Sequence, residues 1–250
     1  MTLPADFTLL TAPTIRAAIR RDLVPLLAPW LLAPELALPA DAQPITSGRG
    51  AVYRATVPGG VRAVVRFYRR GGWLGRFIRE TYVGRPPRPL QELALTTEIR
   101  RRGVEAAEVL AARVEGGLAY RGVLVTAEVP GAVPLIEALR AAPDAAERRT
   151  LAARAGGAVA RLHDAGVWHA DLNMNNVLVP TEGPGALVFV DFDRARLSAG
   201  PLAVDARREN LRRLRRSLRK LDPQGAFGGD AESGAFHRAY DTTAGVPCGC

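Results

Sequence analysis

The sequence predicts an α+β protein of two lobes, with a β-rich N-terminal lobe and a mainly helical C-terminal lobe. In the first half, strand-like runs at Gly48–Val57 and Val61–Tyr68 flank the turn residues Pro58–Gly60. After Gly131 the apolar residues recur with helical spacing instead. At 250 residues, the chain is long enough for two lobes and a sizeable core.

The N-terminal half contains three further segments, taken here in order. Residues 1–44 are rich in proline and fit no regular element, so we expect an N-terminal extension there. Leu90–Arg102 has one apolar face and stops at Gly103, which predicts a helix. Val109–Val114 and Tyr120–Val129 predict a second pair of strands.

The C-terminal half is predicted to consist mainly of helices, at Pro134–Ala141, Asp144–Ala165 and Asp205–Leu221. The change of pattern near Glu128–Gly131 predicts a boundary and a hinge between the lobes. The expected division is therefore an extension, an N-terminal lobe, a C-terminal lobe and a tail, at residues 1–44, 45–128, 129–225 and 226–250.

Composition restricts the partners and the compartment. The formal charge of +9, from 34 basic against 25 acidic residues, suggests an anionic partner such as a nucleotide, a nucleic acid or a membrane surface. Met1–Leu10 has no basic start and no long apolar run, so we expect no export signal. Leu23–Ala40 is the most apolar stretch, but four prolines and Glu35 make it too broken to span a bilayer. Cys248 and Cys250 are too close for a useful disulfide loop and indicate a disordered tail.

The most informative segment is residues 169–179, which is followed by the Val-Asp-Phe-Asp of residues 190–193. An aspartate, an asparagine five residues later and a second aspartate after a strand have the spacing of a kinase active site. In that geometry Asp171 faces the acceptor hydroxyl, while Asn176 and Asp191 hold Mg²⁺ against ATP. The strand-like runs around a Gly- and Pro-rich turn predict a hairpin that brings Asn176 and Asp191 together.

The backbone is predicted to contact the nucleotide at two places. Gly48, Arg49 and Gly50 form a glycine-bearing turn ahead of a strand, where backbone N–H groups can point at phosphate. The segment Glu128–Gly131 is expected to offer backbone groups to adenine.

Arg66 is the candidate side chain for phosphate. A protein kinase uses a lysine on this strand, but Lys220 is the only lysine in the chain and lies far downstream. A guanidinium is always charged and can contact a phosphate through two N–H groups. Glu92, which opens the following helix, is the expected partner of Arg66. His169 is expected to pack and hydrogen-bond beside the catalytic loop rather than to transfer protons.

Three positions depart from the protein-kinase pattern. Ala170 stands where an arginine usually grips a phosphorylated activation loop, so gating by such phosphorylation is not expected. Asn173 stands where protein kinases have a lysine near the transferred phosphate, and Asp193 replaces the glycine of Asp-Phe-Gly. These differences predict a small or lipid-linked acceptor rather than a peptide.

Several of these segments occur together in one known family. They are Gly48–Gly50, Val65–Gly72, the helix of Glu92, Leu162–Asn173, Val190–Arg194 and Asn210–Leu218. With this combination the chain resembles the 3-deoxy-D-manno-octulosonic acid (Kdo) kinases of the lipopolysaccharide kinase family. Arginine at position 66 and asparagine at position 173 look like features of that family, whereas Met174 departs from its pattern.

The resemblance implies a protein-kinase-like fold and ATP-dependent phosphorylation of a Kdo hydroxyl on Kdo-lipid A. It also implies a peripheral enzyme of lipopolysaccharide biosynthesis at the cytoplasmic face of the inner membrane. It carries the role of base onto Asp171, with ATP and Mg²⁺ as cofactors.

Residues Asp205–Leu221 predict a strongly basic helix with an apolar stripe. The stripe consists of Leu211, Leu214, Leu218 and Leu221. The remaining surface carries Arg207, Arg208, Arg212, Arg213, Arg215, Arg216, Arg219 and Lys220. The helix is either a lobe helix with a solvated basic face or, in addition, a contact for anionic headgroups or lipid A phosphates. Nucleic-acid binding is not expected, because no aromatic platform accompanies the basic run.

Three alternatives stay open at the level of sequence. One is another sugar or small-molecule kinase, for example a heptose kinase. A second is a catalytically inactive nucleotide-binding module at the membrane, against which the presence of Asp171, Asn176 and Asp191 speaks. A third is a basic membrane-binding or nucleic-acid-binding protein with an incidental kinase motif.

Overall fold

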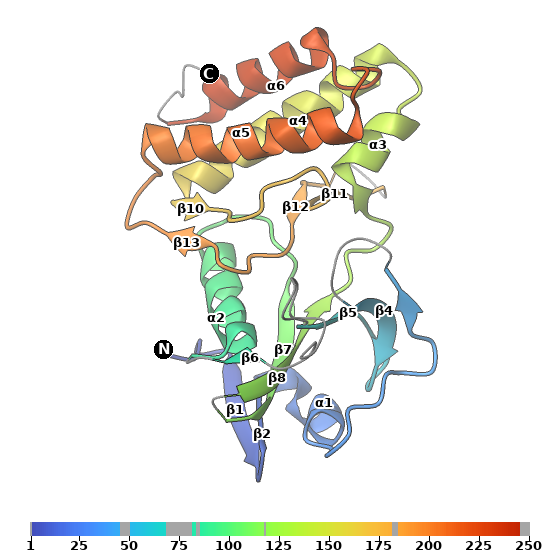
Figure 1. Ribbon diagram of the computed structural model, residues 1–250, viewed down its shortest axis with the longest axis vertical. Coiled ribbons are helices and arrows are strands. Elements are labelled where there is room, and N and C mark those ends of the chain that lie inside the picture. The colour runs from blue at the N-terminus through green and yellow to red at the C-terminus, as the bar shows by residue number, and fades with distance from the viewer. Residues whose placement is uncertain are drawn as a thin grey trace. The chain divides into compact units, whose positions relative to one another are not determined.

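The structure is a computed structural model that describes residues 2–45, 51–68, 82–83, 86–117, 119–181 and 185–245 (Figure 1). Its contacts divide the chain into two compact units. The first consists of Met1–Glu98 and Ala107–Glu128, and the second of Ile99–Ala106 and Val129–Cys250. The first unit contains the large sheet and the second contains most of the helices. The α+β class predicted from the sequence is therefore confirmed.

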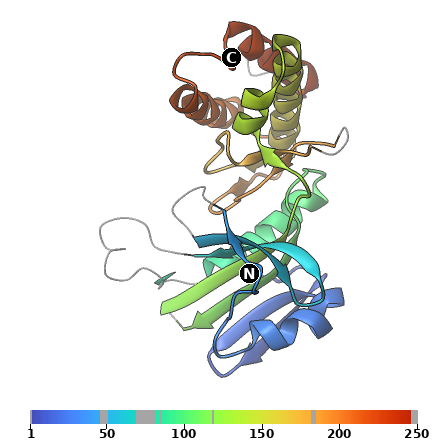
Figure 2. The same cartoon turned by 90° about the vertical axis from the view of Figure 1, so that its right-hand side faces the viewer.

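An antiparallel sheet forms the centre of the first unit (Figure 2). Within the described residues it has eight strands in the order β1-β2-β7-β8-β5-β4-β3, and β6 pairs with β8 at the side. The strands are β1 (Phe7–Ala12), β2 (Ile15–Arg20), β3 (Gln43–Pro44), β4 (Ala51–Val57), β5 (Val61–Phe67), β6 (Tyr82–Val83), β7 (Val109–Gly116) and β8 (Ala119–Ala127). The two predicted hairpins are thus present as β4–β5 and β7–β8.

The N-terminal segment belongs to this unit, which corrects the expectation of a separate extension at residues 1–44. Strand β2 pairs with β7 along its length, so the first hairpin extends the sheet. A short 3₁₀ turn, Arg21–Leu23, then leads into helix α1 (Val24–Leu31). The sequence analysis did not predict this helix, because prolines usually interrupt helices. Pro25 occupies its first turn, where the missing N–H costs nothing, and burial of Leu27 and Leu31 stabilises the rest.

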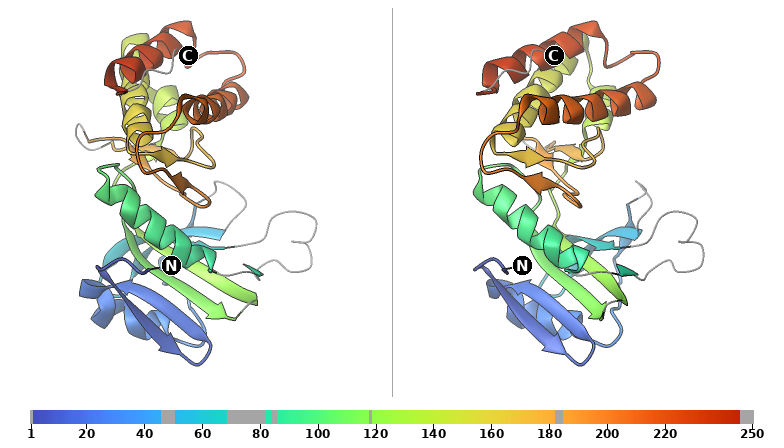
Figure 3. Two further views of the ribbon diagram at one scale, coloured as in Figure 1. Left: turned by 90° about the vertical axis from the view of Figure 1, so that its left-hand side faces the viewer. Right: turned by 60° about the vertical axis from the view of Figure 1, so that its left-hand side comes forward.

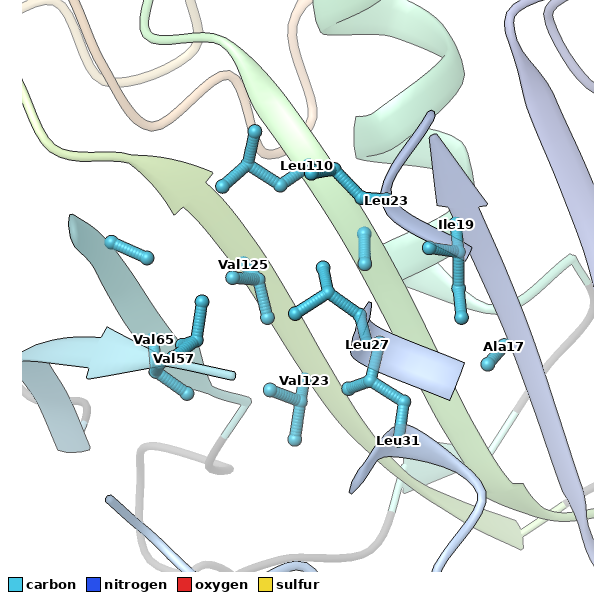
Figure 4. Close-up of a cluster of buried hydrophobic side chains, with 12 residues drawn as sticks. Ala17, Ile19, Leu23, Leu27, Leu31, Val57, Val65, Leu110, Val123 and Val125 are labelled. Atoms are coloured by element: carbon cyan, nitrogen blue, oxygen red, sulfur yellow. The ribbon is translucent and has the colours of Figure 1, made fainter. Parts of the chain in front are cut away.

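One helix covers each face of the sheet. On the first face, Leu27 and Leu31 of α1 point at the strands, where Val123 and Val125 meet them (Figure 4). On the second face lies α2 (Arg88–Arg101), the helix predicted at Leu90–Arg102, and Leu90 packs there among sheet residues (Figure 3). The alternation of buried side chains on the strands therefore supplies two apolar clusters, one per helix.

The second unit has four helices among its described residues, together with two small antiparallel sheets. The helices are α3 (Leu135–Ala141), α4 (Ala145–Asp164), α5 (Val204–Leu221) and α6 (Asp230–Thr243). The short strands are β9 (Val133–Pro134), β10 (Val167–Trp168), β11 (Val177–Val179), β12 (Val188–Phe189) and β13 (Arg196–Leu197). Asp144 caps α4 by accepting the N–H of Glu147 at 2.8 Å. The helices predicted for this half are confirmed.

Helix α6 corrects the expectation that residues 226–250 form a tail. It packs closely along α4, and its Tyr240 is fully buried. The phenol of Tyr240 lies 2.8 Å from Nδ1 of His163 on α4. Cys248 and Cys250 lie outside the described residues.

Arg207 is also placed differently from the prediction, which put it on the basic surface of its helix. Its side chain is fully buried and forms a 2.7 Å ion pair with Asp164. It also donates to the carbonyl of Leu202 at 2.8 Å and to the phenol of Tyr240 at 3.4 Å. This arginine therefore ties α4, α5 and α6 together instead of facing solvent.

None of the helices in the described ranges is both long and apolar enough to cross a membrane.

Two adjacent glycines on α4 provide a test of the α4–α6 packing. A Cβ at Gly156 would lie 2.1 Å from the carbonyl oxygen of Phe236 on α6, whereas one at Gly157 would make ordinary contacts at 3.4 Å and beyond. We expect Gly156→Ala to lower the free energy of unfolding by roughly 1–3 kcal/mol, because a backbone atom must move. Gly157→Ala, the matched control, should raise it by about 0.5–1 kcal/mol through helix propensity. Urea denaturation measures both, and equal effects would contradict the proposed clash.

Candidate active site

The predicted hairpin brings Asn176 and Asp191 to neighbouring positions in the second unit. Strands β11 and β12 pair antiparallel, with Val177 opposite Phe189. One step further along the hairpin, the N–H of Val190 donates to the carbonyl of Asn176 at 3.1 Å. Asp191 is the next residue after Val190 and therefore lies near Asn176, as the sequence pattern predicted.

His169 connects the catalytic loop to this hairpin. Its ring is fully buried, and its Nδ1 accepts the N–H of Asp171 at 3.2 Å. Because Nδ1 is the acceptor, Nε2 carries the proton and donates to the carbonyl of Val190 at 3.1 Å. Burial lowers the pKa of His169, which keeps the ring neutral. The prediction that His169 packs and hydrogen-bonds is confirmed, and its ring also contacts Phe192 at 4.9 Å between centroids.

Asn173 shapes the turn between Asp171 and Asn176. Its Oδ1 accepts the N–H groups of Asn175 and Asn176, at 2.9 and 3.1 Å. Its Nδ2 donates to the carbonyl of Asp171 at 3.1 Å. The residue that replaces the kinase lysine is thus a structural element of the loop, a role that the sequence analysis did not assign.

The side chain of Asn176 is oriented by the same carbonyl. Its Nδ2 donates to the carbonyl of Asp171 at 2.8 Å, so Oδ1 points to the other side of the amide. Asp191 beside it adopts a left-handed backbone conformation with φ of 63°. Short polar residues such as Asp tolerate this region better than most. An amide oxygen and a carboxylate at neighbouring positions are the hard oxygen ligands that suit Mg²⁺, which takes its remaining ligands from phosphate and water.

The carboxylate of Asp171 is exposed while its backbone is held on both sides. The N–H is bound by His169, and the carbonyl accepts from Asn173 and Asn176. A carboxylate on so constrained a backbone can accept a proton from a hydroxyl group placed next to it.

Helix α5 supports the loop through three residues to which the sequence analysis assigned no role in the site. Asn210, fully buried, exchanges two hydrogen bonds with the backbone of His169, at 3.0 and 2.9 Å. Arg213 donates to the carbonyl of Ala170 at 3.1 Å, and Ser217 accepts the N–H of Met174 at 3.2 Å. Their spacings of three and four residues place them on one side of the helix, and this spacing beside the leucine stripe was the signal available in the sequence.

The first unit contains the ion pair predicted between Arg66 and Glu92. Arg66 lies on β5 and its Nη2 donates to Oε2 of Glu92, whose side chain is only 4% exposed. The side chain of Arg66 is 20% exposed. The phenol of Tyr68 joins the same two groups. Gly48, Arg49 and Gly50 lie outside the described residues.

The side chain and the N–H of Glu128 both contact residues of the sheet in the first unit. Its buried carboxylate pairs with Arg54 at 2.7 Å and with Arg62 at 2.6 Å. Its N–H donates to the carbonyl of Arg62 at 3.1 Å. A nucleotide would therefore use other backbone groups of residues 128–131, and this contact stays a prediction.

Comparison with known proteins gives the family. The model of the lipopolysaccharide kinase (Kdo/WaaP) family matches residues 42–240. A 3-deoxy-D-manno-octulosonic acid kinase of Xanthomonas axonopodis pv. citri is 36% identical over 220 residues, which cover 82% of this chain and 79% of the relative. The enzyme of the same name from Vibrio parahaemolyticus is 32% identical over 178 residues, or 70% of this chain and 71% of the relative.

Solved structures with similar folds include other kinases. WaaP in complex with acyl carrier protein aligns with a TM-score of 0.55 and 21% identity, over 81% of this chain and 78% of its own. Amicoumacin kinase hAmiN in complex with AMP-PNP, Ca²⁺ and Ami aligns with a TM-score of 0.60 and 12% identity, over 90% and 78%. These alignments show a kinase-like fold. Together with the family match over most of the chain, they show that this protein belongs to the lipopolysaccharide kinase (Kdo/WaaP) family.

Proposed function

We propose that this protein transfers the γ-phosphoryl group of ATP to a Kdo hydroxyl of Kdo-lipid A during assembly of the lipopolysaccharide core. The observation that carries the proposal is the pair of hydrogen bonds from the buried ring of His169. They join the backbone of Asp171 to that of Val190, directly before Asp191. In a member of the lipopolysaccharide kinase family, this arrangement matches the parts that phosphoryl transfer needs.

The residues of the second unit account for the acceptor side of the reaction. The carboxylate of Asp171 orients the acceptor hydroxyl and takes its proton as the oxygen bonds to the γ-phosphorus. The bond between that phosphorus and the bridging oxygen breaks, and ADP leaves. Asn176 and Asp191 are the proposed ligands of Mg²⁺, which neutralises charge on the phosphates when bound.

The residues of the first unit account for the nucleotide side. The guanidinium of Arg66, held by Glu92, is proposed to bind phosphate oxygens in place of a lysine. The N–H groups of Gly48, Arg49 and Gly50, which lie outside the described residues, are proposed to contact the phosphates, as their glycine-rich sequence predicts.

The named relatives support Kdo as the acceptor. The curated relatives at 32–36% identity are 3-deoxy-D-manno-octulosonic acid kinases. Ala170, at the position of the arginine that grips a phosphorylated loop in protein kinases, is consistent with an acceptor that is not a peptide. A heptose acceptor is the main alternative, since the family includes other lipopolysaccharide kinases.

A lipid-linked acceptor agrees with the surroundings of α5. The helices of the second unit line an open, largely apolar cavity of about 300 Å³. Leu211, Leu214 and Leu218 of α5 line it, and arginines at positions 208, 212 and 215 lie among the same lining residues. Apolar surface beside guanidinium groups suits acyl chains next to phosphates. We therefore propose peripheral binding at the cytoplasmic face of the inner membrane.

Phosphate transfer to defined acceptors tests the proposed reaction. Purified protein with radiolabelled Mg-ATP should label Kdo-lipid A, and label a heptosylated acceptor or a peptide far less. Asp171→Asn should lower the rate by roughly 10²- to 10⁴-fold while ATP still binds, because only the proton acceptor is lost. Asn175→Ala, in the same loop and exposed, is the matched control and should stay near the wild-type rate. Preferential labelling of the heptosylated acceptor would contradict the proposed Kdo acceptor and would indicate a heptose kinase.

Arg66 gives a test of the nucleotide side. Arg66→Lys should keep more activity than Arg66→Ala, because an ammonium retains the charge but loses the planar, two-pronged geometry. Arg16→Ala, which removes an arginine from strand β2 of the same sheet, serves as the control. The KM for ATP measures all three, and undiminished activity in both Arg66 variants would remove Arg66 from the mechanism.

The basic surface of α5 gives a test of membrane binding. Arg212, Arg215 and Arg219 are exposed, and each cation near an anionic surface contributes about 1 kcal/mol, reduced by salt. Replacing all three with Gln should weaken binding to phosphatidylglycerol vesicles and lower activity on lipid-linked acceptor, with little change on a soluble Kdo analogue.

The matched control replaces Arg149, Arg161 and Arg238 with Gln, which removes the same charge from exposed positions on α4 and α6. Co-sedimentation with vesicles compares the two triple variants. Equal binding by both would show that α5 is not the membrane contact.

A further inference from the structure

Tyr68 is a buried side chain that joins the two charged partners of the first unit. It directly follows β5, two residues after Arg66, and is 6% exposed. Nη2 of Arg66 donates to its hydroxyl at 3.0 Å, and that hydroxyl donates to Oε2 of Glu92. The guanidinium carbon of Arg66 also lies 4.8 Å from the centre of the Tyr68 ring. Arginine, glutamate and tyrosine therefore form a closed triangle of contacts.

A tyrosine suits this position for a chemical reason. Its hydroxyl accepts one hydrogen bond and donates another, which a phenylalanine cannot do. The buried carboxylate of Glu92 needs donors to offset its desolvation, and the hydroxyl adds one to that from Arg66. The face of the ring attracts the guanidinium as well.

The triangle also fixes the direction of the guanidinium. Both Glu92 and Tyr68 engage the same nitrogen, Nη2 of Arg66. Rotation of the guanidinium would break both hydrogen bonds at once, so its plane keeps one orientation. A lysine ammonium has no such plane, and this is why an arginine at this position benefits from a second anchoring group.

Strand β8, which pairs with the backbone of Tyr68, also lets α2 lie close to the sheet. The N–H of Tyr68 donates to the carbonyl of Gly122 on β8 at 2.9 Å. A Cβ at Gly122 would lie 2.4 Å from Cγ of Pro89, so the absence of a side chain lets the start of α2 approach. Nearby, the phenol of Tyr120 accepts the N–H of Arg88 at 3.0 Å. The first turns of α2 are therefore anchored where Glu92 meets Arg66.

We propose that Tyr68 is a positioning residue, which holds Glu92 and the guanidinium of Arg66 in the arrangement that binds the phosphates of ATP. Tyr68 acts through Arg66 and does not touch the nucleotide. The inference rests on the proposed function, in which the guanidinium of Arg66, held by Glu92, binds phosphate.

The test is a double-mutant cycle on ATP binding. Tyr68→Phe keeps the ring and removes the hydroxyl, and we expect the Kd for ATP to rise roughly 10- to 100-fold, the range for a lost hydrogen bond to a charged group. In an Arg66→Ala background, the same change should have little further effect, because the group that Tyr68 positions is gone. Tyr53→Phe is the matched control, since it removes a phenol from strand β4 of the same sheet, where the ring packs edge-on against Phe67.

Two outcomes would overturn the inference while leaving the proposed function intact. One is an unchanged Kd for ATP in Tyr68→Phe, in an enzyme that phosphorylates Kdo-lipid A. The other is an equal loss in the wild-type and Arg66→Ala backgrounds, which indicates a merely structural role. If the hydroxyl is needed for folding, 4-aminophenylalanine at position 68 restores a donor and should recover ATP affinity. Absence of ATP binding in the wild-type protein would overturn both proposals.

Discussion

The buried imidazole of His169 is the contact on which the proposed active site depends. One nitrogen accepts from the backbone of Asp171, and the other donates to the backbone carbonyl of Val190, directly before Asp191. The ring therefore fixes the positions of the two aspartates relative to each other. A neutral imidazole offers one acceptor and one donor, whereas a protonated imidazole offers two donors. Burial lowers the pKa of the ring and thereby preserves this pattern. A proton on Nδ1 would replace the acceptor by a donor that faces another N–H.

Helix α5 extends this constraint to the rest of the second unit. Asn210 fixes the backbone of His169, while Arg207 on the preceding turn is buried against Asp164 of α4. Further along, Arg213 and Ser217 hold the loop on either side of Asp171. The same helix presents arginines to solvent on its other side. A single helix thus supports the loop of the proposed base and carries the cations proposed to meet the lipid.

The sequence predicted those parts of the fold that depend on neighbouring residues. The hairpin that brings Asn176 to Asp191, the pair of Arg66 and Glu92, and the main helices follow from local periodicity and motif spacing. Long-range packing was not predictable in this way. The prolines of α1 concealed a helix whose formation depends on burial of Leu27 and Leu31 against distant strands. The burial of Arg207 depends on Asp164 and Tyr240, and nothing next to it in the sequence marks it as different from the other arginines of α5.

The N-terminal hairpin has a practical meaning for how the catalytic region can be isolated. The family match begins at residue 42, yet β2 pairs with β7 and α1 covers one face of the sheet. A fragment cut at that boundary would leave β7 as an unpaired edge and expose the apolar surface that Leu27 and Leu31 cover. Unprotected edges beside apolar surface are prone to intermolecular strand pairing. The first forty residues therefore protect this unit against aggregation. A soluble fragment with catalytic activity has to include them.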